Sequence, residues 1–350
     1  MNIHMKKSIA EIEINHNFSG SALIKENHNI LAEVNKGYAN RSEQLQNRTL
    51  TRYGIASGCK LFTAIAICQL VEERKLSFDS KLNECLDLPF PNFDEEITIH
   101  HLLTHTSGIP DYFDEEVMDD FEELWVENPM YRIRSLKDFL PLFQDQAMKF
   151  QPGERFHYNN AGYILLGLIV EQASHMNFTD YIQEHIFNKA GMVDSGYFEM
   201  DALPPNTAQG YIDNPDGSWK TNIYSLPAKG GSDGGAFVTV HDMDRLWDAL
   251  MNNHLLSEAY TQQLLTSHAQ ESEVDFYGYG VWMKKTENDR IFKYHVMGYD
   301  PGVSFHSAYY PGKSIKVVVC CNQSTGAFQL MKSMEDAIHS STLEKQSLHP

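Results

Sequence analysis

Long apolar runs are missing from this sequence. The longest ones, at residues 62–71 and 163–170, fall far short of the about 20 residues that span a bilayer. The first twenty residues contain two lysines, with no run of seven or more apolar residues after them, which is not the pattern of a secretory signal. The sequence as written therefore predicts a cytoplasmic protein without a membrane segment, and an extracytoplasmic one if an export signal has been removed.

Positive charge is also scarce. The chain has 28 Lys and Arg against 47 Asp and Glu, which gives a formal net charge of −19. Phosphate backbones and anionic lipids are bound by basic surfaces. We therefore expect neither nucleic acid nor a membrane as a partner.

Cysteine pairs and sequence repeats are absent as well. The five cysteines form an odd set without a C-x-x-C pair, a pattern that fits reduced thiols and disfavours metal binding through sulfur. No repeat or low-complexity segment interrupts the 350 residues, so the chain is expected to be compact throughout. We expect no metal and no cofactor.

Strand patterns occupy both ends of the chain. After a short N-terminal helix, SGSALIK and ILAEVNKGYAN flank a turn, and residues 265–323 again give strand signals. Apolar spacing near 3.6 predicts helices between them, in EITIHHLLTH, SLKDFLPLFQDQ, GYILLGLIVEQASH, FTDYIQEHIFNKA and VHDMDRLWDALMNN. This order predicts an α+β fold with one sheet made from both termini, a helical subdomain, and a functional site where the two meet.

Ser57 and Lys60 begin an apolar segment that reads as a buried helix. A spacing of three places both side chains on one helix face, within contact distance. The helix N-terminus supplies free N–H groups and positive potential, and burial shifts a lysine toward its basic form. An activated serine is one interpretation. The other is a serine N-cap followed by a lysine that extends to solvent.

Further segments support the first interpretation through a family resemblance. S-x-x-K is the nucleophile motif of penicillin-binding proteins and serine β-lactamases. RYGIASGCKLFTAIAI resembles the nucleophile segment of the class C β-lactamase, D-alanyl-D-alanine carboxypeptidase and esterase family. Residues 97–112, 150–174 and 277–282 resemble other stretches of that family in the same order. The similarity runs over about residues 17–325, and it implies an antiparallel sheet with helices on both faces.

The resemblance also implies roles for individual residues. Ser57 matches the nucleophile and Lys60 the neighbouring base or electrostatic partner. YNN stands where the family has Y-x-N. Tyr158 would be the phenol, held as a phenolate by cationic neighbours, that passes the serine proton to the leaving group. Asn160 would orient the substrate and the lysine.

The third family motif, K-T-G or H-x-G before P-G, departs from the pattern here. Counting back from P-G aligns Val296, Met297 and Gly298 with it, and His295 falls one residue early. We favour this register because only Gly298 lets substrate pack against the strand. His295 would then point to the opposite face, unless a bulge returns it to the site. The backbone N–H groups of Ser57 and Tyr299 would form the oxyanion hole.

A missing polar side chain in this motif affects the expected substrates. That side chain contributes to recognition of the carboxylate of a penicillin or a D-Ala terminus in the resembling family. Acylation of Ser57 remains predicted, because backbone N–H groups do not depend on the side chain. Esters become more credible substrates beside β-lactams and D-amino-acid peptides.

Weaker signals are interpreted structurally. His101 and His105 have a zinc-like spacing but no H-E-x-x-H glutamate, so a hydrogen-bonding role is preferred. Cys59 is expected to be a packing residue. KGGSDGGAF, residues 229–237, lacks the G-K-[ST] ending of a phosphate loop and reads as a tight loop beside the cleft. The acidic run at residues 111–128 could form one wall or lid that repels anionic substrates.

The sequence thus predicts a single domain over residues 1–350, with a sheet-containing part at about 1–80 and 260–350 and a helical part at about 81–259. The predicted function is a metal-independent serine hydrolase that forms an acyl-enzyme on Ser57. Gly298, Tyr299, His295 and Asn160 are the candidate substrate-binding residues. The alternative is a non-catalytic or slowly deacylating protein that senses penicillin with the same pocket.

Overall fold

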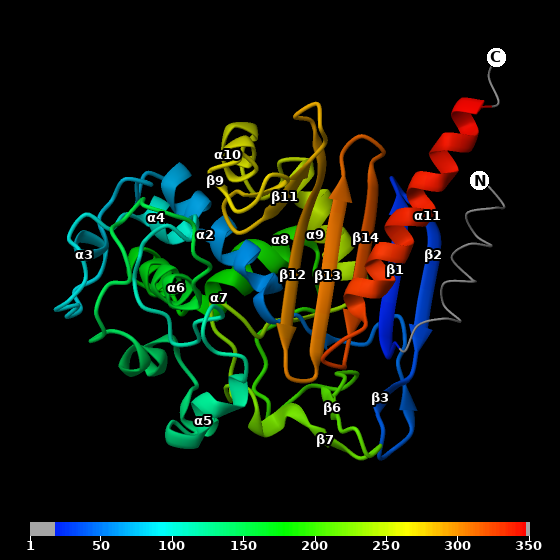
Figure 1. Cartoon of the computed structure of the whole chain (residues 1–350), viewed down its shortest axis with the longest axis horizontal. Helices are drawn as coiled ribbons and strands as arrows, with labels where there is room; N and C mark the ends of the chain where they lie inside the picture. The colour runs from blue at the N-terminus through cyan, green and yellow to red at the C-terminus, as the bar shows by residue number, and fades with distance from the viewer. Residues whose placement is uncertain (1–17, 348–350) are drawn as a thin grey trace.

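An eight-stranded sheet organises the protein, whose computed structural model describes residues 18–347. Its strand order is β2-β1-β14-β13-β12-β11-β10-β9 (Figure 1), and every neighbouring pair is antiparallel. Strand β1 pairs with β14 from Gly20↔Cys321 to Glu26↔Ile315, so strands from the two ends of the chain are neighbours near one edge of the sheet. The strands are β1 Gly20–Glu26, β2 Asn29–Lys36, β9 Ala269–Gln270, β10 Asp275–Tyr277, β11 Trp282–Lys285, β12 Ile291–Asp300, β13 Val303–Tyr310 and β14 Ile315–Cys321.

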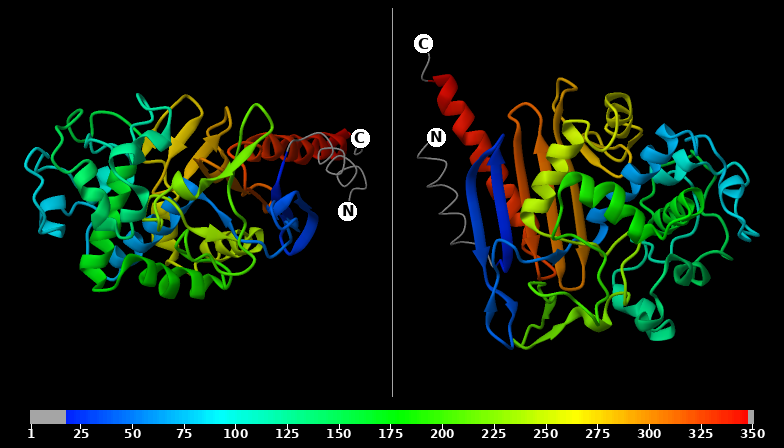
Figure 2. Two further views of the ribbon diagram at one scale, coloured as in Figure 1. Left: turned by 90° about the horizontal axis from the view of Figure 1, so that it is seen from below. Right: turned by 180° about the vertical axis from the view of Figure 1, so that it is seen from behind.

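Helices cover both faces of this sheet, as the resemblance implied. Helix α11 (Ala327–Ser347) lies on one face, and α2 (Lys60–Glu72) and α9 (Val240–Met251) lie on the other (Figure 2). Strand β14 is buried along its whole length. Its Val318 belongs to the large core under α2 and α9, whereas Val317 and Val319 belong to the smaller core under α11. The alternation of side chains along a strand explains how one run of valines serves two cores.

The helical part lies at one end of the sheet (Figure 1). Its centre is α6 (Asn160–Ser174), which packs against α2 and α4. Helix α2 is buried on nearly every side, as its unbroken apolar sequence predicted. The other helices are α3 Leu82–Cys85, α4 Ile99–Leu103, α5 Leu124–Glu127, α7 Phe178–Ile182, α8 Asn188–Ala190 and α10 Glu258–Leu264, with 3-10 turns η1 Ala56–Cys59, η2 Phe121–Glu123, η3 Met130–Arg132, η4 Leu136–Leu142 and η6 Asn222–Tyr224, and a π turn, η5 Gln183–Phe187.

Small two-stranded sheets link the main elements around the large sheet. They pair β3 Tyr38–Asn40 with β4 Leu45–Gln46, β5 Tyr53–Gly54 with β8 Phe237–Val238, and β6 Tyr211–Asp213 with β7 Trp219–Thr221. The β5–β8 pair matters most, because it joins the chain just before Ser57 to the end of the glycine-rich loop 229–237.

Most predicted elements are confirmed, and the exceptions have physical reasons. SLKDFLPLFQDQ forms the 3-10 turn η4 rather than an α-helix, because Pro141 lies inside it and proline lacks the N–H that a regular helix needs. YGYGVW is mostly the turn between β10 and β11, with Gly280 at φ 68°, where glycine is favoured. The short N-terminal helix falls outside the described residues.

Two other expectations concern the division of the chain into two parts and the presence of membrane-spanning helices. The division near residues 80 and 260 stays a prediction, and α9 within the middle part packs on β14 and β1. In the part of the chain that the structure describes, no helix is long and apolar enough to cross a bilayer.

The burial of α2 leads to a stability prediction. Phe62 is 0% exposed and makes an edge-to-face contact with Phe187 at 5.0 Å between ring centroids. We expect Phe62→Ala to lower the free energy of unfolding by about 3–5 kcal/mol, because it leaves a cavity in the core. Urea denaturation followed by circular dichroism measures this, with Val117→Ala on an exposed loop as the control. Equal effects of the two substitutions would contradict the assigned core.

Candidate active site

Ser57 lies in a tight turn between the sheet and α2. Turn η1 carries it, and helix α2 begins three residues later at Lys60. Ala56, directly before Ser57, has φ 45°, a left-handed conformation that is unusual for a residue with a side chain. Such local strain is common at functional sites. The sharp turn presents Ser57 at the wall of a cavity.

Lys60 is buried beside Ser57 rather than extended to solvent. Its side chain is enclosed, with the whole residue only 2% exposed. The Nζ atom donates hydrogen bonds to Ser57 Oγ at 2.9 Å, to Asn160 Oδ1 at 2.8 Å and to the backbone oxygen of Asp233 at 2.8 Å. Three acceptors use the full donor capacity of a lysine ammonium. The structure therefore contradicts the interpretation of a capping serine with a solvent-directed lysine.

Tyr158 is the aromatic group closest to this pair. Its ring centroid lies 4.9 Å from Lys60 Nζ, and the ring packs on His105 at 4.4 Å and stacks with Trp282 at 6.2 Å. Burial, followed by the charge of Glu115, raises the pKa of Tyr158 well above its usual value, although a hydrogen bond with Ser57 acts in the opposite direction. This direction disfavours the phenolate that the resemblance implied.

Asn160 is fixed by the start of α6. Its backbone N–H donates to Asp111 Oδ2 at 2.6 Å, and the N–H of Ala161 donates to Asp111 Oδ1 at 3.0 Å. The Nδ2 group of Asn160 also reaches Asp111, at 3.3 Å, which leaves its Oδ1 facing Lys60. Burial raises the pKa of Asp111 to about 7 despite these bonds. Asp111, which the sequence analysis did not single out, thus orients Asn160.

Strand β12 approaches the nucleophile turn at Gly298. A Cβ atom added there would lie 2.1 Å from the carbonyl oxygen of Ile55 and 2.8 Å from the backbone nitrogen of Ser57. Only glycine fits at such a distance, which supports the register chosen from the sequence. Gly298, Met297 and the half-exposed Tyr299 all line the cavity.

His295 is not brought to the cavity. It pairs across the sheet with Trp282 and Ala308, and Ala308 belongs to the core under α11. The His295 ring stacks on Trp282 at 6.5 Å, and burial keeps its pKa well below the usual value. The opposite orientation that strand alternation predicted is what the structure shows.

The cavity around Ser57 is about 640 Å³ and is lined by Ser57, Tyr158, Asn160, Gly298 and Tyr299 among others. Aromatic side chains form much of its wall. Acidic side chains reach it from three segments, namely Glu115, Asp119, Asp120 and Glu122 from the acidic run, Asp233 from loop 229–237, and Asp300 from the end of β12. Among the described residues that line it, none is Lys, Arg or His.

Two predicted walls are confirmed by this lining. The glycine-rich loop contributes Gly230, Gly231, Gly234 and Gly235 beside Asp233, and the acidic run forms the side facing it. Trp282, Asp233 and Asp300 are cavity residues that the sequence analysis did not single out. Trp282 and Asp233 do occur in stretches it named, residues 277–282 and 229–237.

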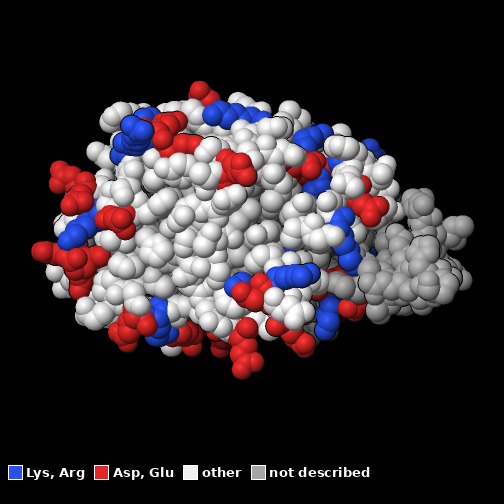
Figure 3. Space-filling model, turned by 90° about the horizontal axis from the view of Figure 1, so that it is seen from above, with Lys and Arg blue, Asp and Glu red and all other residues white. Residues whose placement is uncertain are grey.

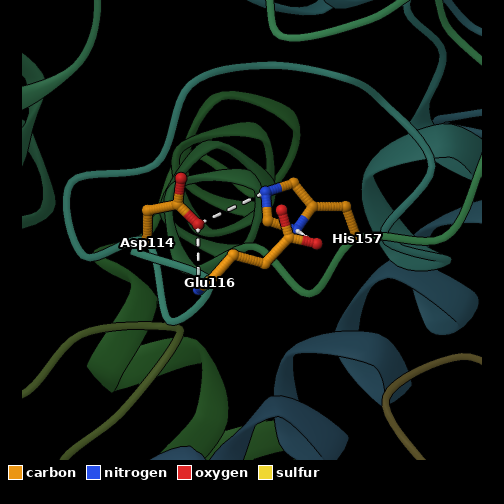
Figure 4. A group of neighbouring side chains, drawn as sticks. All are labelled: Asp114, Glu116 and His157. Carbon is orange, nitrogen blue, oxygen red and sulfur yellow. Dashed lines mark hydrogen bonds and ion pairs between the residues drawn. The ribbon is translucent and has the colours of Figure 1, made fainter. Parts of the chain in front are cut away.

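One group of side chains near the cavity has the composition of a metal site. Asp114, Glu116 and His157 point toward one another, with ligand atoms within 4.8 Å (Figure 4). Lys149, however, binds Asp114 and contacts His157, and Arg155 pairs with Glu116 at 3.1 Å. Two cations already neutralise the acids, so the group is best described as an ion-pair network.

The remaining sequence candidates have structural roles. His105 Nδ1 accepts a hydrogen bond from the N–H of Asn159 at 3.1 Å, and His101 Nδ1 accepts from the N–H of Thr98 at 3.2 Å. Cys59 is 0% exposed, and burial raises the pKa of its thiol to about 12. A buried, protonated thiol is a poor nucleophile, so Cys59 does not compete with Ser57.

Comparison with known proteins gives consistent matches. A family model described as Beta-lactamase matches residues 11–338. A penicillin-binding protein of Bacillus subtilis (strain 168) is 28% identical over 364 residues, covering 99% of this chain and 75% of that protein. The crystal structure of a penicillin binding protein from Bacillus halodurans is 60% identical, with a TM-score of 0.90 over 94% of this chain and 99% of that one. An octameric penicillin-binding protein homologue from Pyrococcus abyssi is 27% identical, with a TM-score of 0.81 over 95% and 76% of the two chains.

The close approach of β12 leads to a second prediction. Gly298→Ala should push the strand away from the turn that holds Ser57, and a displacement of about 1 Å can lower a reaction rate about 100-fold. The rate at which a fluorophosphonate probe labels Ser57 measures this effect. Gly312→Ala, where nothing lies within 4 Å of the added Cβ, is the matched control. Unchanged labelling of the Gly298 variant would argue against the contact.

Proposed function

This chain belongs to the beta-lactamase family and is a serine hydrolase of that superfamily, and we propose that Ser57 is its nucleophile. The observation that carries this proposal is the hydrogen bond from buried Lys60 to Ser57 Oγ at 2.9 Å. A cation held at this distance stabilises negative charge as it develops on the serine oxygen. The phenol of Tyr158 can donate a proton.

A proton relay through Tyr158 accounts for the two protons that move during acylation. As Ser57 Oγ forms its bond to the acyl carbon, the Tyr158 phenol gives its proton to the leaving group and takes the proton of Ser57. The Tyr158 phenol is thus regenerated, and the resting site needs no phenolate. The N–H groups of Ser57 and Tyr299 are proposed to hold the oxyanion. Water then attacks the acyl group, and the same relay returns the proton to Ser57.

The cavity favours small substrates without a carboxylate. Its volume of about 640 Å³ lies in the range of small-molecule sites. An anionic substrate would meet acidic walls with no lining cation among the described residues, and like charges repel. Esters and amides without a carboxylate are therefore proposed as substrates, ahead of β-lactams and D-alanyl peptides. The same charge gives no support to a penicillin-sensing protein.

Replacement of the nucleophile tests this function. Ser57→Ala should lower ester hydrolysis by at least about 10³-fold, because the acyl-enzyme cannot form. Intact-protein mass spectrometry after incubation with a fluorophosphonate probe should show a mass gain in the wild type and none in this variant. Cys59→Ala is the control and should still be labelled. Full hydrolysis by Ser57→Ala would refute the assignment.

A conservative change tests the proton relay. Tyr158→Phe keeps the ring that stacks on Trp282 and removes only the hydroxyl. We expect kcat/KM to fall about 10²–10⁴-fold for an alkyl ester, whose leaving group needs a proton, and much less for a nitrophenyl ester, whose leaving group departs as an anion. Equal losses for both esters, measured by steady-state kinetics, would speak against proton transfer by Tyr158.

A further inference from the structure

Three carboxylates that line the cavity interact electrostatically with Lys60. Glu115 comes from the acidic run, Asp233 from the glycine-rich loop and Asp300 from the end of β12. Burial raises the pKa of each of the three, and the charge of Lys60 acts in the opposite direction. When all three are ionised, negative charge exceeds positive charge beside Ser57. A cationic ligand would offset this excess.

The three carboxylates differ in how well the protein satisfies them. Asp233 accepts a hydrogen bond from the hydroxyl of Tyr112, and Glu115 is exposed at the cavity wall. The Asp300 carboxylate has no hydrogen-bond or ion-pair partner among the described residues, although the residue is partly buried where it lines the cavity. Buried carboxylates are normally paired. Asp300 is therefore a group whose partner the protein itself does not supply.

The ion-pair network beside the cavity holds Glu115 at the wall. Its two chain neighbours, Asp114 and Glu116, are bound by Lys149 and Arg155, and Figure 4 shows both of them pointing to His157. Glu115 between them lines the cavity with Ser57. The cations of this network are thus used outside the cavity, and Glu115 stays free to meet a ligand.

Acidic groups are not gathered in this way everywhere on the protein. On the face shown in Figure 3, side chains of both signs surround a broad area that has none. Inside the cavity only acids occur among the charged lining residues, together with the aromatic residues Phe113 and Trp282. Carboxylates and ring faces together are the two features that bind organic ammonium groups.

We propose that the substrate of this serine hydrolase carries an ammonium group, which binds in the part of the cavity that Asp300 and Glu115 line. The inference rests on the proposed function and specifies its substrate class. The acyl carbonyl would bind at Ser57 while the cation contacts the two carboxylates, so that charge selects the substrate. Both residues are specificity determinants here and take no part in bond making.

A matched set of nitrophenyl esters tests the proposal. The acyl groups are 4-(trimethylammonio)butanoyl, its uncharged carbon analogue 5,5-dimethylhexanoyl, and the anionic adipoyl monoester. We expect kcat/KM to favour the cationic ester over its analogue by about tenfold or more, the size of one charge contact in a partly open site, with the anionic ester slowest. A wild-type ratio of one or less would overturn the proposal.

Variants assign the preference to the two carboxylates. Asp300→Asn and Glu115→Gln should each lower the ratio of cationic to neutral kcat/KM toward one, and Glu43→Gln, an exposed acid in the turn before β4, should leave it unchanged. A ratio that falls in all three variants would indicate a general electrostatic effect and would contradict the proposed contact. An unchanged ratio in the two cavity variants would also contradict that contact. Hydrolysis of the neutral ester and labelling of Ser57 report separately on the proposed function.

The pH dependence of the ratio is an independent readout. Burial, together with Asp233 and Glu115 and against Lys60, raises the pKa of Asp300 to about 8. Asp300 gains its charge as pH rises through this value, so the preference for the cationic ester should increase between pH 6.5 and 9. The increase should be absent in Asp300→Asn. The quaternary ammonium does not titrate, which keeps the charge of the ligand constant across this range.

Discussion

The three hydrogen bonds of Lys60 connect the parts of this protein that make the site. One goes to the nucleophile turn, one to the start of α6 in the helical part and one to the loop that precedes β8. Breaking any of them would leave a buried charge incompletely satisfied, which is strongly unfavourable. The lysine therefore fixes the relative positions of Ser57, Asn160 and the glycine-rich loop, and Asp111 holds Asn160 in turn.

A second constraint acts through backbone atoms. At Gly298 the strand β12 lies so close to Ile55 and Ser57 that no side chain fits. The oxyanion donors proposed here are backbone N–H groups on either side of this contact. Val296 can therefore replace the polar residue of the related motif without removing these donors.

The surroundings of the site have a consistent electrostatic character. Burial and neighbouring acids raise the pKa of Tyr158 well above its usual value and that of Asp300 to about 8. Proton transfer from a neutral phenol and attraction of a positive ligand both follow from this environment. The aromatic packing of Tyr158 on His105 and Trp282 holds the phenol in place for that transfer.

The sequence by itself determined the strands at both ends, the buried α2 and the pairing of Ser57 with Lys60, because these depend on local spacing and on apolar periodicity. It also singled out Gly298, for the approach of substrate, whereas the structure shows that β12 itself lies against Ile55 and Ser57 at this residue. Only the tertiary structure decided which acids share the cavity, because Glu115, Asp233 and Asp300 are far apart in the chain. The burial that raises the pKa of Tyr158 likewise depends on packing between distant segments, which the sequence does not show.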